Sequence, residues 1–393
     1  MKLIQIFFLT LSCCLWPAYR GQAQQAALSP EAQISVITCG PGTDLYATFG
    51  HSAFRVWDPV QGIDWVYNYG TFDFNTPNFY LKFARGKLLY ALSRQAFPNF
   101  LYTYQLEQRW VREQLLDLSP AEQEELFAFL EQNNRPENRY YHYDFLFENC
   151  ATKIPEVLRR VLGDPLVFEP GHLKEPHTFR ELIQQNLDRN TWSSLGIDLA
   201  LGAVIDREAR PKEYMFLPHY VRLQMDDSRL GSAPLVQRER VILELPELRP
   251  ESYFTATPLF WLLLLLAFTV ALTAIDFRHG WRSRWLDTFL FAGTGLAGLF
   301  MFFLWFLTDH SSTAWNANLL WALPTNAIMA VYLLRKPNPR VLTAYLKLAL
   351  TLLGICPLLW ALGVQGFSPV LVVLWLALSL RYAYLIRYLK PQP

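Results

Sequence analysis

Residues 259–275 read LFWLLLLLAFTVALTAI and contain no charged side chain. Four further long and mostly apolar stretches follow, at residues 286–307, 319–334, 342–362 and 367–389. Each stretch approaches or reaches the roughly 20 residues that a helix needs to cross a bilayer. Residues 258–393 are therefore predicted to form an all-α bundle of five transmembrane helices.

The loops of this bundle differ in charge, and the difference predicts its orientation. Basic residues occupy the loop after the first span, the loop after the third span and the C-terminus: Arg278, Arg282, Arg284, Arg335, Lys336, Arg340, Arg387 and Lys390. The alternate loops, 308–318 and 363–368, contain no Lys or Arg. Because basic loops stay in the cytoplasm, loop 308–318 and the segment before the first span are predicted to lie on the outer side of the membrane.

The N-terminus agrees with this topology. Residues 1–23 resemble a secretory signal peptide, with Lys2 before an apolar core at residues 3–16 and small residues at Gly21 and Ala23. The alternative is an uncleaved membrane anchor. Residues 24–257 are then predicted to be an exported domain of a multi-pass membrane protein.

The composition of the 393-residue chain excludes several classes of protein. Hydrophobic residues make up 52% and charged residues 18%, whereas soluble domains carry about a quarter charged residues. This excludes a disordered chain and argues against one large soluble enzyme. The net charge of +1 argues against nucleic acid as a partner. Five cysteines are too few for a disulfide scaffold.

The exported domain has an α+β pattern. We predict strands at residues 34–40, 45–57, 63–70, 88–97 and 100–106. Ser119 and Glu122 form a capping box around Pro120, which predicts a helix that continues to about Asn133. A second helix is expected to end at Gly163, and Pro155 allows it to begin at Cys150 with Asn149 as the cap.

Cys150 is the candidate nucleophile. At a helix N-terminus the amide dipoles lower the pKa of a thiol, so that a nearby imidazole can take its proton. The candidate base is His51, which follows Gly50 on a predicted strand. Three alternatives stay open: a Cys39–Cys150 disulfide, Cys150 as a small buried hydrophobic residue, and His51 as a structural residue.

Other polar residues indicate less. His142, His172 and His177 with Cys150 match no compact zinc spacing, so no metal site is predicted. No cofactor is predicted either, because the sequence has no phosphate-binding Gly-rich loop. Four arginines are expected on solvated faces, where any of them could meet a lipid phosphate: Arg109, Arg112, Arg159 and Arg160.

Several motifs together resemble one family. They are Phe49-Gly50-His51, Tyr67-Asn68-Tyr69-Gly70-Thr71-Phe72-Asp73-Phe74, Phe83-Ala84-Arg85-Gly86-Lys87-Leu88, Asn149-Cys150-Ala151-Thr152 and, in the outer loop, His310 with Asn316-Ala317-Asn318-Leu319-Leu320-Trp321. The His-before-Cys order resembles the circularly permuted papain-like fold of NlpC-type peptidases and lecithin:retinol acyltransferase relatives. The whole set resembles the Lnb-type lipoprotein N-acyltransferases.

This resemblance implies a location and a function. Residues 24–257 would lie in the periplasm, and the bundle would lie in a bacterial inner membrane. The chain would move a fatty acyl chain from a phospholipid, through a thioester on Cys150, to the N-terminal amine of a diacylglyceryl-cysteine lipoprotein. The resemblance does not fix the third catalytic residue. We choose Asn68, because it follows His51 on the next strand and could orient the ring, with Asp58 and Asp73 as alternatives.

Further residues of these motifs are accessory candidates. Asn149 and Tyr67 flank the catalytic candidates in sequence, and His310, Asn316 and Asn318 lie in or beside the outer loop. Polar groups close to a membrane are costly unless they are satisfied, so they tend to mark function. We expect this loop to lie over the Cys150 face and to help position a substrate. A plain connecting turn is the alternative.

Two other functions remain compatible with the sequence. One is an exported papain-like cysteine peptidase or amidase that acts on cell-wall peptides and uses the bundle as an anchor. The other is a non-enzymatic, partner-binding membrane protein with Cys39 and Cys150 in a disulfide. The peptidase is the stronger alternative, because it keeps the Cys–His pair.

Overall fold

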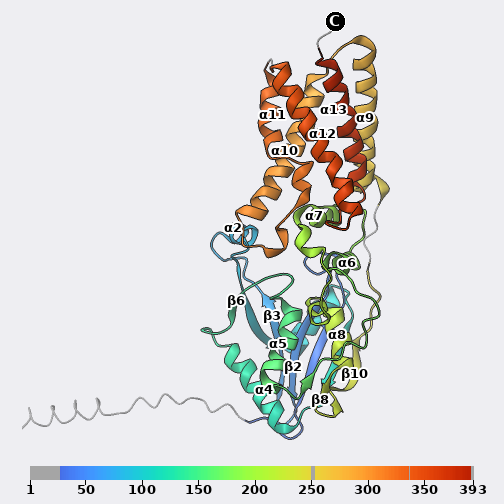
Figure 1. Cartoon of the computed structure of the whole chain (residues 1–393). Coiled ribbons are helices and arrows are strands. Elements are labelled where there is room, and N and C mark those ends of the chain that lie inside the picture. The colour runs from blue at the N-terminus through green and yellow to red at the C-terminus, as the bar shows by residue number, and fades with distance from the viewer. Residues whose placement is uncertain (1–26, 249–252, 336, 391–393) are drawn as a thin grey trace, which may run out of the picture.

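The computed structural model describes residues 27–248, 253–335 and 337–390. The predicted signal peptide, residues 1–23, lies outside the described residues. A sheet-containing domain and a helical bundle are stacked end to end (Figure 1). The predicted class, an α+β domain followed by an all-α bundle of five apolar helices, is confirmed.

The N-terminal domain is built on a seven-stranded sheet with the order β10-β5-β1-β2-β3-β4-β6. Its strands are β1 (Gln33–Cys39), β2 (His51–Asp58), β3 (Ile63–Thr71), β4 (Leu89–Ala96), β5 (Val111–Leu116), β6 (Tyr140–His142) and β10 (Val236–Leu243). Neighbouring strands are antiparallel, and β1 and β2 pair so that Cys39 lies opposite His51. The candidate base therefore lies at the end of a central strand.

Helices cover both faces of the sheet. Successive side chains of a strand point to opposite faces, so the apolar side chains on each face need helices packed on them. One face, with Phe54 and Tyr67, packs on α4 (Pro120–Asn133) and α5 (Cys150–Leu162). The other face, with Ala53 and Val66, packs on α3 (Phe97–Leu106). The predicted limits of α4 and α5 are confirmed, with Ser119 and Glu122 forming the capping box of α4.

Two sequence predictions within this domain are wrong. Residues 100–106 are not a strand but part of α3, which has a proline in its first turn. Its buried residues Phe97, Phe100 and Tyr104 recur at helical spacing. The predicted strand 45–57 begins only at His51, because Gly50 adopts a φ of 81° after a turn. No side chain fits there, since a Cβ on Gly50 would lie 2.7 Å from the Cys39 carbonyl oxygen.

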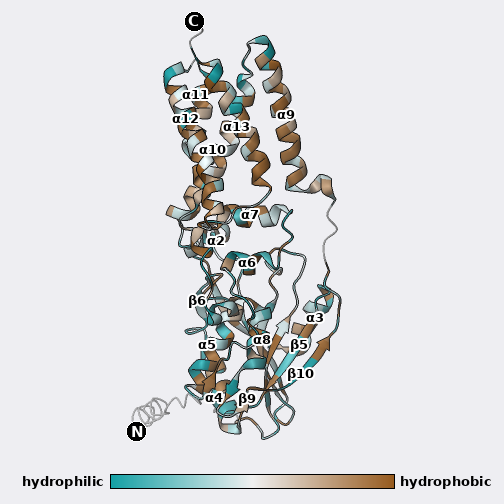
Figure 2. Cartoon of the chain, turned by 45° about the vertical axis from the view of Figure 1, so that its right-hand side comes forward, coloured by the Kyte–Doolittle hydropathy of each residue, from teal (hydrophilic) through white to brown (hydrophobic). Residues whose placement is uncertain are grey.

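Shorter elements complete the domain. They are α2 (Phe79–Ala84), α6 (Phe179–Gln184), α7 (Trp192–Ala200), α8 (Pro218–Asp227), the 3-10 turns η1 (Ala203–Ile205), η2 (Pro211–Phe216) and η3 (Phe254–Ala256), and a small sheet of β7 (Leu166–Val167), β8 (Arg229–Leu230) and β9 (Ala233–Pro234). Of these, α2 and α7 lie next to the bundle in Figures 1 and 2.

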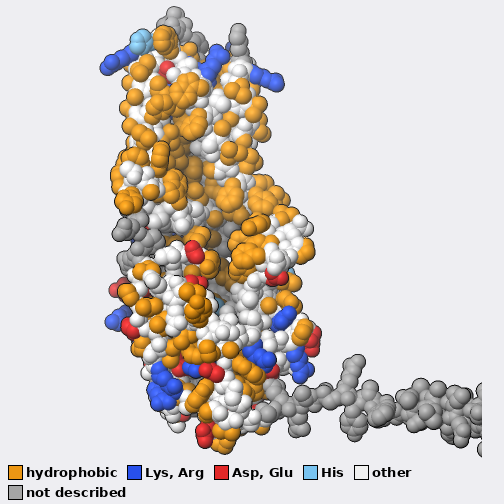
Figure 3. All heavy atoms as spheres, turned by 180° about the vertical axis from the view of Figure 1, so that it is seen from behind, with side chains coloured by type: hydrophobic (Ala, Val, Ile, Leu, Met, Phe, Trp, Pro, Cys, Tyr) orange, Lys and Arg blue, Asp and Glu red, His pale blue; other side chains and the backbone are white. Residues whose placement is uncertain are grey.

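Each of the five apolar stretches forms a helical segment. They are α9 (Pro258–His279), α10 (Arg284–Phe306), η5 (Ala317–Leu320) with α11 (Thr325–Leu334), α12 (Pro339–Ala361) and α13 (Leu371–Tyr388). Most of their residues are hydrophobic (Figure 2). Figure 3 shows hydrophobic side chains along the surface of the bundle and Lys and Arg at its far end. This apolar band between two polar ends is what a bilayer requires.

Backbone contacts join the bundle to the domain. The Gly202 N–H donates to the Ser312 carbonyl at 3.0 Å, and the Asp309 N–H donates to the Arg85 carbonyl at 2.9 Å. A Cβ on Gly202 would overlap with the Ala314 carbonyl oxygen, so this approach requires glycine. Loop 308–318 therefore contacts the N-terminal domain at two separate segments of the chain.

Buried side chains strengthen this interface. Arg180 is 4% exposed and binds Asp198 at 3.1 Å and Asp206 at 2.7 Å. Asp206 also accepts a hydrogen bond at 2.9 Å from the N–H of Gly366, in the second outer loop. Because buried charges must be paired and hydrogen-bonded, this cluster fixes α6 and α7 against the outer end of the bundle.

Candidate functional site

Cys150 is the first residue of α5, and Asn149 caps this helix. The Asn149 side-chain oxygen accepts from the N–H groups of Ala151 and Thr152 at 2.8 and 2.9 Å. Its amide nitrogen donates to the Phe216 carbonyl at 2.8 Å. The cap is 3% exposed, so it holds the helix start rigidly. The half-buried thiol is thereby placed at the positive end of the helix dipole.

His51 lies between Asn68 and Cys150. Its Nε2 lies 2.6 Å from the Asn68 side-chain oxygen. With Nε2 hydrogen-bonded to Asn68, Nδ1 is the ring nitrogen left for an interaction with Cys150. Asn68 thus fixes the tautomer and the orientation of the ring, as the third member of a triad does.

The pKa values of the two central groups move toward each other. Burial disfavours the Cys150 thiolate, but the charge of His51, its hydrogen bond and the backbone N–H groups of Ser52 and Ala151 hold the pKa of Cys150 below its usual value. Burial also disfavours the His51 cation, yet Cys150 and Asn68 raise the pKa of His51 above its usual value. The arrangement favours a thiolate–imidazolium pair.

Backbone and aromatic groups surround the thiol. Gly70 lies beside Cys150, and its φ of 89° favours glycine, although a Cβ there would make only an ordinary contact of 3.5 Å with the Cys150 Cβ. Burial and the charge of a Cys150 thiolate raise the pKa of Tyr143 well above its usual value. Tyr143 stacks on Tyr90 at 4.2 Å between ring centroids, and Phe72 packs on Tyr90 at 5.3 Å. These rings make one side of the site apolar.

Cys39 and Cys150 are separate, free thiols. Cys39 is buried, and burial raises the pKa of its thiol to about 12. Because this thiol is buried and stays protonated, Cys39 is a core residue. The disulfide alternative is therefore absent from this structure.

The alternatives to Asn68 lie elsewhere. Asp58, at the opposite end of β2, accepts from Ser29 and from the N–H groups of the next turn. Asp73 accepts from Asn75 in an exposed turn. Tyr67 points into the core, where its hydroxyl donates to Glu131 of α4 at 2.5 Å. Of these four side chains, Asn68 is the one hydrogen-bonded to His51.

The outer-loop residues divide into two groups. The His310 ring lies against Gly86, and the neighbouring Ser311 donates at 2.7 Å to Asp144, in the segment that leads to Cys150. By contrast, Asn316 donates at 2.7 Å to the Leu199 carbonyl, and Asn318 donates at 3.1 Å to the Asp198 carbonyl. Both asparagines bind the C-terminal part of α7, and these contacts give them a docking role.

The other histidines have separate partners. His172 Nδ1 lies 2.8 Å from Asp227, His177 Nδ1 lies 3.8 Å from Glu181, and His142 lies in β6. Within residues 27–248, 253–335 and 337–390, no His, Cys, Asp and Glu side chains converge as metal ligands.

Arg109 corrects one sequence prediction, because it is 5% exposed and not on a solvated face. It donates to the Gly40 carbonyl and to Glu107, each at 2.7 Å. Its charge opposes protonation of His51 and so offsets a small part of the rise in the pKa of that ring. No sequence pattern indicates this burial, because one partner of Arg109 is the backbone of a residue far along the chain. Gly70 could have been noticed, since glycine inside a strand often marks a close approach.

Comparison with known families adds an independent finding. The chain matches the model of the Lnb N-terminal periplasmic domain over residues 20–185 and that of the Lnb transmembrane domain over residues 250–392. No curated protein and no solved structure matches the chain. Cys150, His51 and Asn68 lie within the first match, and loop 308–318 lies within the second.

The pKa directions predict how Cys150 reacts with iodoacetamide. Alkylation should set in below the pH at which an ordinary thiol ionises. His51→Ala should move this midpoint to higher pH, because the thiolate loses its cation. Asn68→Ala should move it less in the same direction, because a weaker imidazolium stabilises the thiolate less. The measurement is the alkylation rate of the full chain in detergent between pH 5 and pH 10.

Cys39 serves as the internal control in this experiment. With a pKa of about 12 and no exposure, it should remain unlabelled until the protein unfolds. Identical midpoints for the wild type and His51→Ala would refute the ion pair.

Proposed function

Because the chain belongs to the Lnb family, carrying its periplasmic and transmembrane domains in that order, we propose that it is a membrane-bound thiol acyltransferase. It takes a fatty acyl chain from a phospholipid and passes it to the N-terminal amine of a diacylglyceryl-cysteine lipoprotein. The acceptor rests on the resemblance to lipoprotein N-acyltransferases. The chemistry rests on Cys150, His51 and Asn68.

One observation carries this proposal. The segment just before Cys150 is hydrogen-bonded to the outer loop through Asp144 and Ser311. A phospholipid with two acyl chains stays in the bilayer. An enzyme that acts on its ester bond therefore needs its nucleophile close to the membrane. The hydrogen bond between the outer loop and the segment that leads to Cys150 supports such a position.

Helix α2 offers a route for the lipid. Its side chains Tyr80, Leu81 and Phe83 are 79%, 56% and 54% exposed, although they are large and apolar. Arg85, directly after α2, is hydrogen-bonded to the outer loop, so these side chains lie near the bilayer surface. Exposed apolar patches mark contacts with membranes or partners.

The buried part of α2 continues this apolar surface toward the thiol. Phe79 packs on Phe72 at 5.8 Å between ring centroids, and Phe72 packs on Tyr90, which stacks on Tyr143 beside Cys150. An acyl chain entering over α2 would follow aromatic rings to the thiol. The same rings exclude water, which favours transfer to an amine over hydrolysis.

The first half-reaction forms a thioester. His51 takes the thiol proton, and the Cys150 sulfur attacks the ester carbonyl carbon of the phospholipid. The N–H of Cys150 lies at the helix start, where it has no intrahelical partner, so it can donate to the oxyanion. The ester C–O bond then breaks, and His51 returns the proton to the leaving oxygen. Lysophospholipid departs, and the acyl chain stays on Cys150.

The second half-reaction forms the amide. The α-amine of the lipoprotein attacks the thioester carbonyl, and His51 takes a proton from the amine nitrogen. The C–S bond breaks, and Cys150 leaves as the thiolate that His51 stabilises. An ester and an amine have become an alcohol and an amide. Because the thioester is already reactive toward amines, the exchange needs no nucleotide.

The peptidase alternative would use the same Cys–His–Asn geometry on a soluble peptide. It would not require the thiol to be held against the bundle. The two functions therefore predict different results for a variant in which the catalytic residues are intact and only the contact with the outer loop is changed. Such a variant should lose acyl transfer but should keep a peptidase activity.

Substitution of the catalytic residues should abolish acyl transfer. In cells without another lipoprotein N-acyltransferase, Cys150→Ser and His51→Ala should each lower N-acylation about a hundredfold or more, since each removes a nucleophile or a general base. The measurement is mass spectrometry of lipoprotein N-termini at matched protein level. Cys39→Ala is the matched control and should retain activity. Near-normal N-acylation by Cys150→Ser would exclude the covalent route.

Disturbing the interface alone should also reduce transfer. Gly202→Ala places a Cβ against the Ala314 carbonyl, whereas Gly196→Ala, on α7, meets no atom within 4 Å. We expect Gly202→Ala to lower phospholipid-dependent transfer in membranes about tenfold or more, because small misplacements cost large factors in rate. Its Cys150 alkylation profile should not change, and Gly196→Ala should behave as the wild type.

Full phospholipid-dependent acyl transfer by Gly202→Ala would mean that the bundle serves only as a membrane anchor. The peptidase would be supported instead if Cys150→Ser abolished the cleavage of cell-wall peptides and left the lipoprotein N-termini unaltered.

A further inference from the structure

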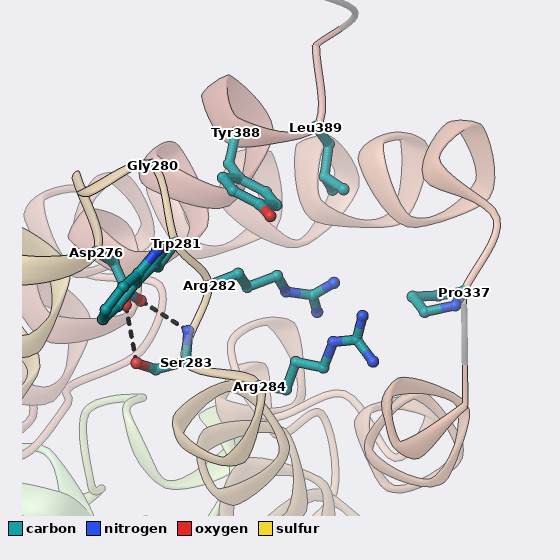
Figure 4. Close-up of a pocket in the computed structure, with 9 residues that line it drawn as sticks. All are labelled: Asp276, Gly280, Trp281, Arg282, Ser283, Arg284, Pro337, Tyr388 and Leu389. Atoms are coloured by element: carbon teal, nitrogen blue, oxygen red, sulfur yellow. Dashed lines mark hydrogen bonds between the residues drawn. The ribbon is translucent and has the colours of Figure 1, made fainter. Parts of the chain in front are cut away.

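A cavity lies at the end of the bundle remote from the periplasmic domain, and therefore at the cytoplasmic surface. It has a volume of about 540 Å³ and lies among the α9–α10 loop, the start of α10, the end of α13 and Pro337 (Figure 4). This size is within the range of pockets that bind small molecules. The proposed acyl-transfer reaction makes no use of it.

Two arginines project into this cavity. Figure 4 shows the guanidinium groups of Arg282 and Arg284 extending into the same space. The side chain of Arg282 is 6% exposed, and its Nε donates to Asp287 at 2.7 Å. Its Nη2 has no hydrogen-bond partner in the described part of the chain. A buried guanidinium nitrogen of this kind requires an acceptor.

The nearby carboxylates are already paired. Asp287 binds Arg282 and also Arg381, each at 2.7 Å. Asp276 binds Arg381 at 2.8 Å and accepts from the N–H and the hydroxyl of Ser283, each at 2.8 Å. Two carboxylates thus balance two guanidinium groups. Arg284, which is exposed, adds a positive charge that this cluster does not neutralise.

The start of α10 adds further donors. Ser283 is the N-cap, but its side chain makes no capping hydrogen bond because its hydroxyl donates to Asp276. The first-turn N–H groups of this 23-residue helix therefore lack a side-chain cap. The N–H groups of Leu286 and Asp287 donate to the Ser283 carbonyl at 3.1 and 3.4 Å, so those of Arg284 and Trp285 remain for an anion. Helix N-termini with uncapped N–H groups favour anions, and phosphate above all.

We infer that this cavity is a binding site for a phosphate group, held by Arg282, Arg284 and the N-terminus of α10. The group belongs to an anionic lipid of the cytoplasmic leaflet or to a free phosphate compound. The position favours the lipid, because basic pockets between transmembrane helices on this side of a membrane bind anionic head groups. Trp281 and Tyr388, 63% and 41% exposed, line the cavity as aromatic residues do at membrane interfaces.

The test uses the full chain in phosphatidylcholine nanodiscs with a minor fraction of phosphatidylglycerol. Native mass spectrometry measures the phosphatidylglycerol that remains bound. Arg284→Gln should weaken this binding about fivefold, as expected for one lost arginine at an anionic surface. Arg278→Gln is the matched control, because Arg278 is an exposed arginine of the same loop region that does not line the cavity.

A second arm distinguishes the sources of the phosphate. Inorganic phosphate is titrated against the nanodisc-bound protein and its Arg284→Gln variant. Retention of phosphatidylglycerol without an effect of phosphate assigns the site to lipid. Arg284-dependent phosphate binding without lipid retention assigns it to a free phosphate compound. No binding in either arm, or equal losses for Arg284→Gln and Arg278→Gln, would overturn the site, and neither result bears on acyl transfer by Cys150.

Discussion

The contact between loop 308–318 and the periplasmic domain is the interaction on which the rest of the molecule depends. It joins the periplasmic domain, which faces water, to the bundle, which faces lipid. The contact consists of backbone hydrogen bonds at Gly202 and Arg85 and of the carboxamides of Asn316 and Asn318, which bind the end of α7. Hydrogen bonds of this kind have fixed geometry. They therefore set the distance between the thiol and the bilayer, as a flexible tether could not.

The site itself depends on a balance between burial and charge. Burial alone would raise the pKa of a thiol, as it does to about 12 for Cys39. Cys150 differs because a helix start, backbone N–H groups and an imidazole held by Asn68 all favour the thiolate. The pKa values of these two thiols thus shift in opposite directions, for reasons that are visible in their surroundings. The stacked rings of Tyr143, Tyr90 and Phe72 form an apolar cluster in the same domain.

The sequence predicted the features that depend on local patterns. Apolar length and loop charge gave the bundle and its orientation, the capping box gave the start of α4, and Asn149 gave the start of α5. Helix α3 was predicted as a strand, because aromatic residues favour strands as well as buried helical faces. The helical spacing of Phe97, Phe100 and Tyr104 would have distinguished the two. Tertiary partners were beyond reach: the burial of Arg109, the Arg180 cluster and the docking of Asn316 onto α7 all join segments distant in sequence.

The proposed acyl transfer requires that Cys150 carry the acyl chain between the two half-reactions. The most direct measurement incubates the purified full chain with a phospholipid whose acyl chain is labelled, in the absence of any lipoprotein acceptor, and follows label on the protein. We predict one acyl group on Cys150 that neutral hydroxylamine releases, because a thioester reacts with that amine. Label that resists hydroxylamine, or that remains on a Cys150→Ala variant, would contradict this prediction.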